Sequence, residues 1–206
     1  LKDDVGYVST LTELVSRFPN KDYWSDLLIS MARVAGTNAR AQLNVSRLME
    51  AAGTMDEAED YLDTAQFAIK AGLPYEAVRV LDQGQAAGLY KGTLAANAAK
   101  LKQQAQQRAA EDDKALKSLT LASDSGTVLV QLGDVLLSKG QWPEAAEAYQ
   151  KALSKGGLKR EAEARLNCGI ALLKAKQLDA AKSMLQSVAG DASAVQMASL
   201  WISLAK

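Results

Sequence analysis

The chain has 206 residues, of which 48% are hydrophobic and 5% aromatic, and its 24 basic residues balance its 24 acidic ones. A net charge of zero offers no general attraction to nucleic acid or to an anionic membrane, and no apolar run approaches the roughly 18 residues of a transmembrane helix. The chain has no histidine and a single cysteine, Cys168, which excludes an internal disulfide and leaves only carboxylates as candidate metal ligands. The alanine-rich and proline-poor composition predicts closely packed helices.

A short amphipathic helix is predicted over residues 7–18, and Pro19 is expected to end it. Its apolar face is expected to consist of Tyr7, Leu11, Leu14 and Phe18. We interpret residues 7–19 as a half repeat, which is either the back half of a unit in a longer array or a cap on the units that follow.

Two helix pairs are predicted next, over residues 21–57 and 58–91. Gly36 divides the first pair, Gly72 divides the second, and Pro74 is placed to start a helix. The residues expected to face inward are Trp24, Leu27, Leu28, Met31, Ala41, Val45 and Leu48 in the first pair, and Tyr61, Ala65, Ala68, Ala77, Leu81 and Gly84 in the second.

The clearest helix pair is predicted over residues 126–159. Gly140 is expected to end its first helix and Pro143 to start its second. Gly133 and Ala145 are twelve residues apart, and we expect the two helices to cross closely there because neither residue has a bulky side chain. The apolar faces are expected to contain Leu129, Leu132 and Leu136 on the first helix, and Tyr149 and Ala152 on the second.

The order of residues in this pair, with Leu-Gly, a glycine break and then Ala-x3-Tyr-x2-Ala, resembles the tetratricopeptide repeat, a helix–turn–helix unit of about 34 residues. The resemblance implies an all-α, right-handed α-solenoid of such units with a concave groove. The tracts RFPNKDYWSDLL, AGLPYEAVRVLDQGQAAG, ARLNCGIALLKAKQLDAAKSML and SLWISLA are also similar to those of exported tetratricopeptide-repeat proteins of Gram-negative bacteria whose function is not established. That narrower resemblance implies a bacterial, periplasmic protein.

The spacing of small residues predicts a further unit in the middle of the chain. Ala65 and Gly133 are 68 residues apart, which is two periods, so one unit is expected over residues 92–125. One interpretation is a degenerate repeat with a turn near residues 110–113, and the preserved spacing on both sides favours it. The other is a longer, more exposed helix, because KLKQQAQQRAAEDDKALKSL contains neither glycine nor proline. In the first case its core contacts would be Leu94, Leu101, Leu116 and Leu119.

The last repeat is expected over residues 162–191, where Gly169 and Ala181 show the twelve-residue spacing again. A final helix over residues 192–206 is expected to cap the exposed face of that pair. The inward residues are expected to be Leu166, Cys168, Leu172, Leu173, Leu185, Val188, Leu200, Trp201 and Leu204. The whole chain, 1–206, is therefore expected to form a single solenoid.

The resemblance also implies a binding surface, because the first helix of each unit lines the groove of such a solenoid. Carried over position by position, the groove face consists of Ser25, Ile29, Arg33, Leu62, Gln66, Lys70, Val130, Asp134, Ser138, Leu166, Ile170 and Lys174. An apolar groove with a few basic residues at its edge suits an amphipathic helix or an extended peptide. Family members that clamp a carboxylate use Lys and Asn at these places, so that clamp is not expected here. The alternative is that Leu62, Ile69, Ile170 and Leu173 pack between neighbouring units.

No other kind of site is expected. Cys168 has no histidine to activate it and is interpreted as a small core residue. The acidic clusters at 57–63 and 111–113 are interpreted as solvated helix starts rather than metal sites. The basic residues between Lys100 and Lys117 alternate with acidic ones, so no nucleic-acid surface and no cofactor are expected.

The sequence therefore predicts a non-catalytic scaffold that binds a peptide or protein segment in the concave groove of a solenoid. The alternative is a structural or assembly subunit of a larger envelope protein, which docks through its convex face or its N-terminal end. Self-association is left open.

Overall fold

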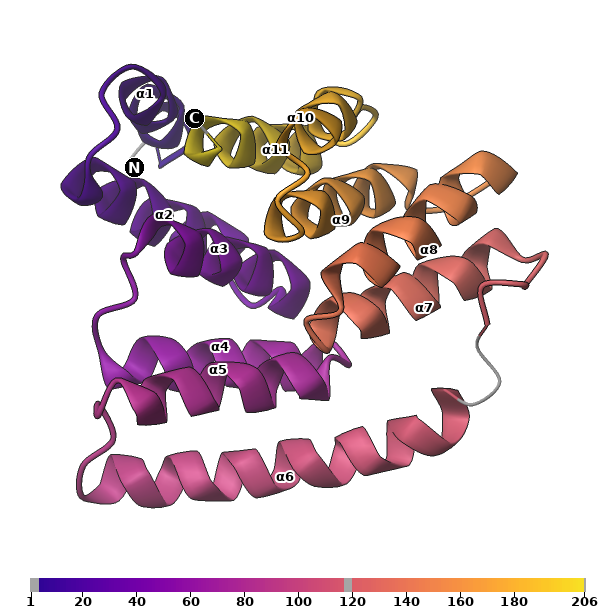
Figure 1. Cartoon of the computed structure of the whole chain (residues 1–206). Coiled ribbons are helices and arrows are strands. Elements are labelled where there is room, and N and C mark those ends of the chain that lie inside the picture. The colour runs from indigo at the N-terminus through magenta and orange to yellow at the C-terminus, as the bar shows by residue number, and fades with distance from the viewer. Residues whose placement is uncertain (1–3, 117–119, 206) are drawn as a thin grey trace. The chain divides into compact units, whose positions relative to one another are not determined.

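A computed structural model describes residues 4–116 and 120–205, and in these ranges the chain forms eleven α-helices and no β-strand (Figure 1). The predicted all-α class is confirmed. The helices are α1 (Asp4–Arg17), α2 (Lys21–Ala35), α3 (Ala39–Ala52), α4 (Ala58–Lys70), α5 (Pro74–Ala86), α6 (Thr93–Leu116), α7 (Gly126–Ser138), α8 (Trp142–Lys155), α9 (Glu161–Lys174), α10 (Leu178–Gln186) and α11 (Ala192–Leu204).

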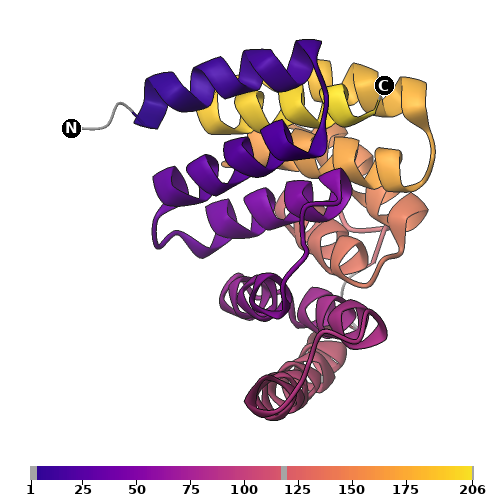
Figure 2. The same cartoon turned by 90° about the vertical axis from the view of Figure 1, so that its left-hand side faces the viewer.

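The helix ends follow the predicted stop and start signals. Gly36 ends α2 with a positive φ of 55°, a conformation that glycine adopts at no steric cost. Pro74 and Pro143 lie in the first turns of α5 and α8, where a backbone N–H would lack a partner in the helix. Helices joined by such short loops pack against their neighbours in the chain, as Figure 2 shows for α1, α2 and α3.

The apolar face of α1 differs from the prediction. Val8, Leu11 and Val15 are the buried residues, whereas Tyr7 and Phe18 are exposed. Leu14 is half-buried. The two valines and Leu11 lie at three- and four-residue spacings and form the side that packs on α2, so the inward face is rotated relative to the one predicted.

The chain divides into two compact units, and the division falls inside α6, between Gln106 and Gln107. In the N-terminal unit, α1 packs on α2, α2 on α3, α3 on α4 and α4 on α5. The first half of α6 completes its core through Ala98 and Ala105, which join a cluster that includes Leu62 and Leu81.

The turn predicted near residues 110–113 is wrong, because α6 is one helix of 24 residues and the longer-helix interpretation is the one observed. Alanine, glutamine, lysine and leucine dominate this segment and are all strong helix formers. Leu94 and Leu101 are partly buried against the core, while the fully buried contacts are made by alanines. The side chain of Leu116 and the whole of Leu119 lie outside the described residues.

In the C-terminal unit, α7 packs on α8, α8 on α9 and α9 on α10, and α11 covers both α9 and α10. Leu200 and Trp201 are buried in that contact, and Leu204 is half-buried. The predicted capping helix is therefore observed.

Small residues on the first helix of a pair make room for large residues on the second. A Cβ atom added to Gly133 would lie 2.7–2.9 Å from ring carbons of Tyr149, and one added to Gly169 would lie 2.5 Å from Cγ of Leu185. The glycines therefore face a large side chain sixteen residues later. Gly133 and Ala145 are both buried, as expected for a close crossing, and the large side chain that lies over the glycine is that of Tyr149.

A buried ion pair joins α3 to α5. The Arg47 guanidinium donates from Nε to Oε1 of Glu76 at 2.8 Å and from Nη2 to Oε2 at 2.6 Å. The two side chains are only 8% and 4% exposed. Arg79 of α5 bonds to Glu50 of α3 at 2.9 Å, one turn further along both helices. Paired, hydrogen-bonded charges of this kind can remain ionised in a core.

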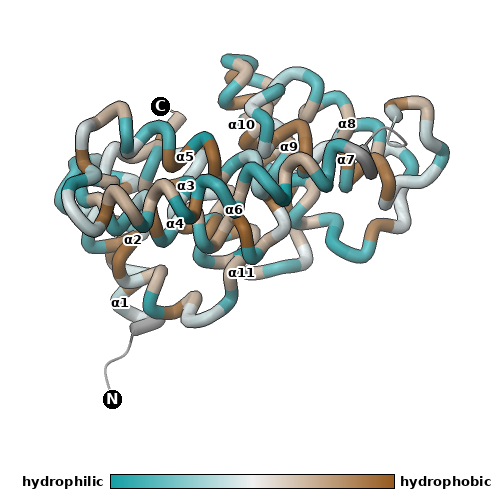
Figure 3. The backbone as a smooth tube through the Cα atoms, turned by 90° about the horizontal axis from the view of Figure 1, so that it is seen from below, coloured by the Kyte–Doolittle hydropathy of each residue, from teal (hydrophilic) through white to brown (hydrophobic). Residues whose placement is uncertain are grey.

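Hydrophobic residues occur along the helices in short groups separated by polar residues, and no long apolar stretch is seen (Figure 3). Among the described residues, no helix combines the length and the hydrophobicity needed to cross a membrane.

Candidate functional site

The predicted groove residues of α2 lie in one row on its surface. Ser25 is half-buried, Ile29 is 44% exposed and Arg33 is exposed. Because the three residues are four apart, they occupy successive turns of one helix face. Leu27 and Leu28 of the same helix are fully buried. An exposed isoleucine next to an arginine is therefore a distinct feature of this helix.

The predicted groove residues of α4 divide into two kinds. Leu62 is buried in the core of the N-terminal unit, whereas Gln66 and Lys70 are exposed. The surface of α4 along this row is therefore polar, and the apolar member of the row contributes to packing. Ile69, for which packing was the alternative, is buried as well.

In the C-terminal unit, the predicted apolar lining is buried. Leu166 and Ile170 of α9 are almost fully buried, because α7, α8, α10 and α11 all pack against this helix. Leu173 is half-buried. These residues pack against neighbouring helices, as the alternative interpretation expects. Their assignment to a binding surface stays a prediction. The remaining predicted residues are Val130, Asp134 and Lys174, which are half-buried, and Ser138, which is buried.

The carboxylate of Asp134 on α7 is held by side chains of α8 and α9. The Tyr149 hydroxyl donates to its Oδ1 at 2.6 Å, and Asn167 donates from Nδ2 to the same oxygen at 3.4 Å. Asn167 is buried, and its Oδ1 atom is without a hydrogen-bond partner in the described structure. Sequence reasoning missed Asn167; the signal for it was a single amide in the apolar run that follows Arg165.

Cys168 lies in the core beside these polar side chains and is not placed for chemistry. Its thiol is fully buried and has a long contact of 3.8 Å from Sγ to the Ala146 carbonyl. Burial raises the pKa of the Cys168 thiol from 9.0 to about 12, so the reactive thiolate is disfavoured. Across the described residues, no group of three or more potential ligand side chains comes together to hold a metal ion.

The buried thiol gives a pH-dependent stability. An unfolded thiol releases its proton near pH 9 and the folded one near pH 12. We therefore expect the free energy of unfolding to be unaffected below about pH 9 and to fall above it, by about 1.4 kcal/mol per pH unit. Urea unfolding between pH 9 and 10 measures this fall. The variant Cys168→Ala should remove most of it in that interval, because burial also raises the pKa of Tyr61 and raises that of Tyr90 from 10.0 to about 12, and both tyrosines contribute mainly above pH 10. An equal fall in the variant would contradict the assignment.

Helix pairs that repeat with the same small-to-large contact define a helical-repeat protein. Residues 136–200, from the end of α7 to α11, match the family model described as tetratricopeptide repeat. The match shows tetratricopeptide repeats in this part of the chain, and the helix pairs elsewhere are consistent with a solenoid of such repeats. Tetratricopeptide repeats are a protein–protein interaction module. No similarity to a curated protein reaches significance.

Proposed function

We propose that the chain is a non-catalytic scaffold that binds a peptide or protein segment along the first helices of its repeats, within one solenoid. The observation that carries the proposal is the exposed Ile29 on α2, a helix whose other large aliphatic side chains, except Val34, are buried. A partner that covers the exposed part of Ile29 removes apolar surface from water, which favours binding at this place. Arg33, one turn further on, adds a donor for an acceptor group of the partner.

The other first helices contribute differently to this surface. Gln66 and Lys70 of α4 present polar groups, and Asp134 of α7 is held in a fixed position by Tyr149. A partner segment that suits the N-terminal unit has an apolar side chain for Ile29 and an acidic or carbonyl group for Arg33. Orientation is then set by polar contacts and affinity by the buried apolar group.

The test uses a matched pair of substitutions. Ile29 is 44% exposed and Val195, on α11, is 42% exposed, so a charge introduced at either place has a similar effect on folding. A partner that co-purifies with the protein is isolated and titrated against both variants by calorimetry. We expect Ile29→Asp to weaken binding by about tenfold or more and Val195→Asp to leave it unchanged. Equal affinity for Ile29→Asp and the unaltered protein would overturn the proposal. Ile170→Asp is unsuited to this test because Ile170 is buried.

The exposed Tyr7 on α1 and the exposed Phe18 directly after it favour a second function, docking of a structural subunit through its N-terminal end. In that case Phe18→Asp, rather than Ile29→Asp, weakens binding of the partner in the same titration. A location in the bacterial envelope is part of both proposals and rests on the resemblance of sequence tracts alone.

A further inference from the structure

Residues 92–125 occupy the place of one repeat. Among the described residues of this range the structure has a single helix, α6, where each of the other repeats has two helices. Ala65, Ala99 and Gly133 follow one another at intervals of 34 residues. Ala65 and Gly133 are buried beneath the second helix of their pair, whereas Ala99 is exposed. Since α6 continues to Leu116, the residue sixteen positions after Ala99 belongs to the same helix and cannot fold back over it.

A pocket of about 310 Å³ lies on this side of α6, within the N-terminal unit. Its lining consists of Leu81, Asp82, Gln85, Tyr90, Ala95, Ala98, Ala99 and Lys102, and we name it the α5–α6 slot. Ala99 and Lys102 correspond, one period earlier, to Ala65 and Ala68, which are both fully buried in the complete repeat. The slot therefore lies on the side where a second helix would pack.

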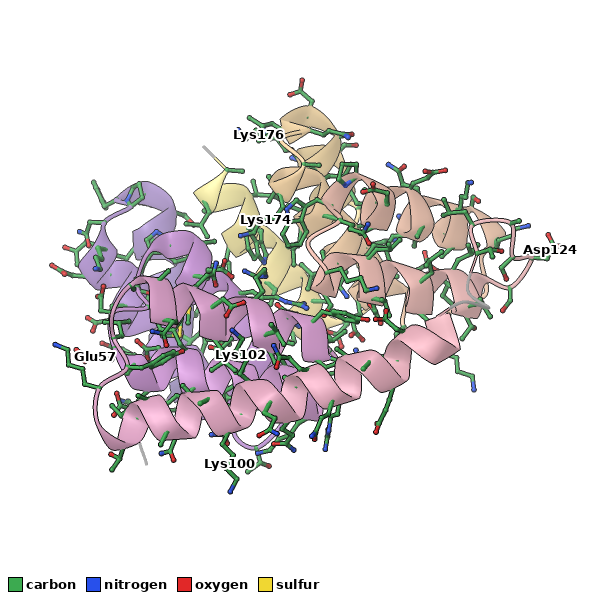
Figure 4. The ribbon with its side chains drawn as sticks, turned by 60° about the horizontal axis from the view of Figure 1, so that its bottom comes forward. Glu57, Lys100, Lys102, Asp124, Lys174 and Lys176 are labelled. Carbon is green, nitrogen blue, oxygen red and sulfur yellow. The ribbon has the colours of Figure 1, made fainter. Side chains whose placement is uncertain are left out.

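The mouth of the slot carries one exposed ion pair. Lys102 of α6 contacts Asp82 of α5 at 2.5 Å, and their side chains are 37% and 52% exposed. Figure 4 shows Lys102 on the α5 side of α6 and Lys100 on the opposite side. An ion pair as exposed as this adds little to stability, so a binding partner can displace it at little cost.

The complete repeats show what fills such a place. Their second helices carry an alanine followed four residues later by a large apolar residue, in the pairs Ala77 and Leu81, Ala145 and Tyr149, and Ala181 and Leu185. The alanine allows the helices to approach, and the large side chain covers the small residue of the first helix, as Tyr149 covers Gly133. Ala99 has the same small side chain but no such cover.

We propose that the α5–α6 slot binds an amphipathic helix of a partner protein, which presents a small residue and, four residues later, an aromatic or branched apolar residue. The partner helix completes the third repeat and buries Ala95 and Ala99. This site is separate from the first-helix surface around Ile29, and neither proposal depends on the other.

The probe is a synthetic copy of α8, residues 142–155, which contains the Ala145 and Tyr149 pattern. Glu147 and Lys151 pair at 2.9 Å on its exposed side, so a lactam bridge between them holds the peptide helical without touching the apolar face. Backbone amide NMR of the full chain is recorded as the peptide is added. We expect shifts at Ala95, Ala99 and Lys102, and affinity about tenfold lower for a peptide with Tyr149→Ser.

A matched pair of protein variants completes the test. Ala99→Leu fills the slot and is expected to reduce peptide affinity by about tenfold or more, because leucine takes the space intended for the partner side chain. Gln104→Leu adds a similar side chain on an exposed face of α6 and is expected to leave affinity unchanged. The proposal would be overturned if the peptide does not bind, or if Ala99→Leu leaves its affinity unchanged. It would also be overturned if the shifts are confined to α7 and α9, because the peptide would then have replaced α8 in its own repeat.

Discussion

Replacing Glu76 with alanine is expected to lower the free energy of unfolding of the N-terminal unit by about 3–5 kcal/mol. The substitution leaves the Arg47 guanidinium, which is 8% exposed, without the two carboxylate oxygens that accept from it at 2.8 and 2.6 Å. Arg47 keeps its contact with Oδ1 of Asn44 at 3.3 Å, but a neutral amide does not replace the carboxylate charge that offsets the lost hydration of the guanidinium. Urea unfolding followed by circular dichroism measures the loss.

Two further variants separate the buried pair from an ordinary surface contact. Arg47→Met combined with Glu76→Leu removes both charges and fills the space, so it is expected to restore most of the stability lost by Glu76→Ala. Glu147→Ala breaks the exposed pair with Lys151 on α8 and is expected to cost less than about 1 kcal/mol. If Glu76→Ala has no larger effect than Glu147→Ala, the buried pair is not what joins α3 to α5.

Replacing Tyr149 with alanine is expected to destabilise the C-terminal unit by about 3–5 kcal/mol. The ring is fully buried, packs on Gly133, and donates its hydroxyl hydrogen to Asp134 at 2.6 Å. Tyr149→Phe keeps the ring and removes only the donor, so a smaller loss of about 1–3 kcal/mol is expected. Thermal and urea unfolding of both variants give the two values.

The exposed Tyr7 on α1 provides the control for this prediction. Tyr7→Ala removes the same side chain from a solvent-exposed position and is expected to change stability by no more than about 0.5 kcal/mol. Gly133→Ala tests the contact from the other side: it favours the helix by propensity but forces a Cβ to within 2.7 Å of the ring. A stabilised Gly133→Ala variant would contradict the close contact with Tyr149.

The elements that could be predicted from the sequence are those with local causes. Gly36, Pro74 and Pro143 act on their own backbone, so the helix ends they set were found without knowledge of the rest of the fold. The spacing of small residues likewise located the helix pairs. The same spacing led to the incorrect turn within α6. It shows where a repeat is expected along the chain, but not whether the segment forms two helices or one.

Contacts between distant residues could not be predicted in the same way. Arg47 and Glu76 have the composition of surface residues, and only the packing of α3 beside α5 makes them a buried pair. Ile29 and Ile170 hold the same position in their repeats, yet one is exposed and the other buried. The difference is in their neighbours: α2 packs against α1 and α3, whereas α9 contacts α7, α8, α10 and α11. Whether a groove position is buried therefore depends on the helices that pack around it, and not on its place in the repeat.

The central claim, that a partner segment lies along the first helices, is tested most directly by photo-crosslinking. A photoreactive phenylalanine derivative is placed in turn at Ile29 and Gln66 on first helices, and at Lys151 and Lys182 on second helices; all four positions are exposed. With the co-purified partner, we predict crosslinks from the first two positions and little from the others. Crosslinks of equal yield from Lys151 and Lys182 would contradict the proposed binding surface.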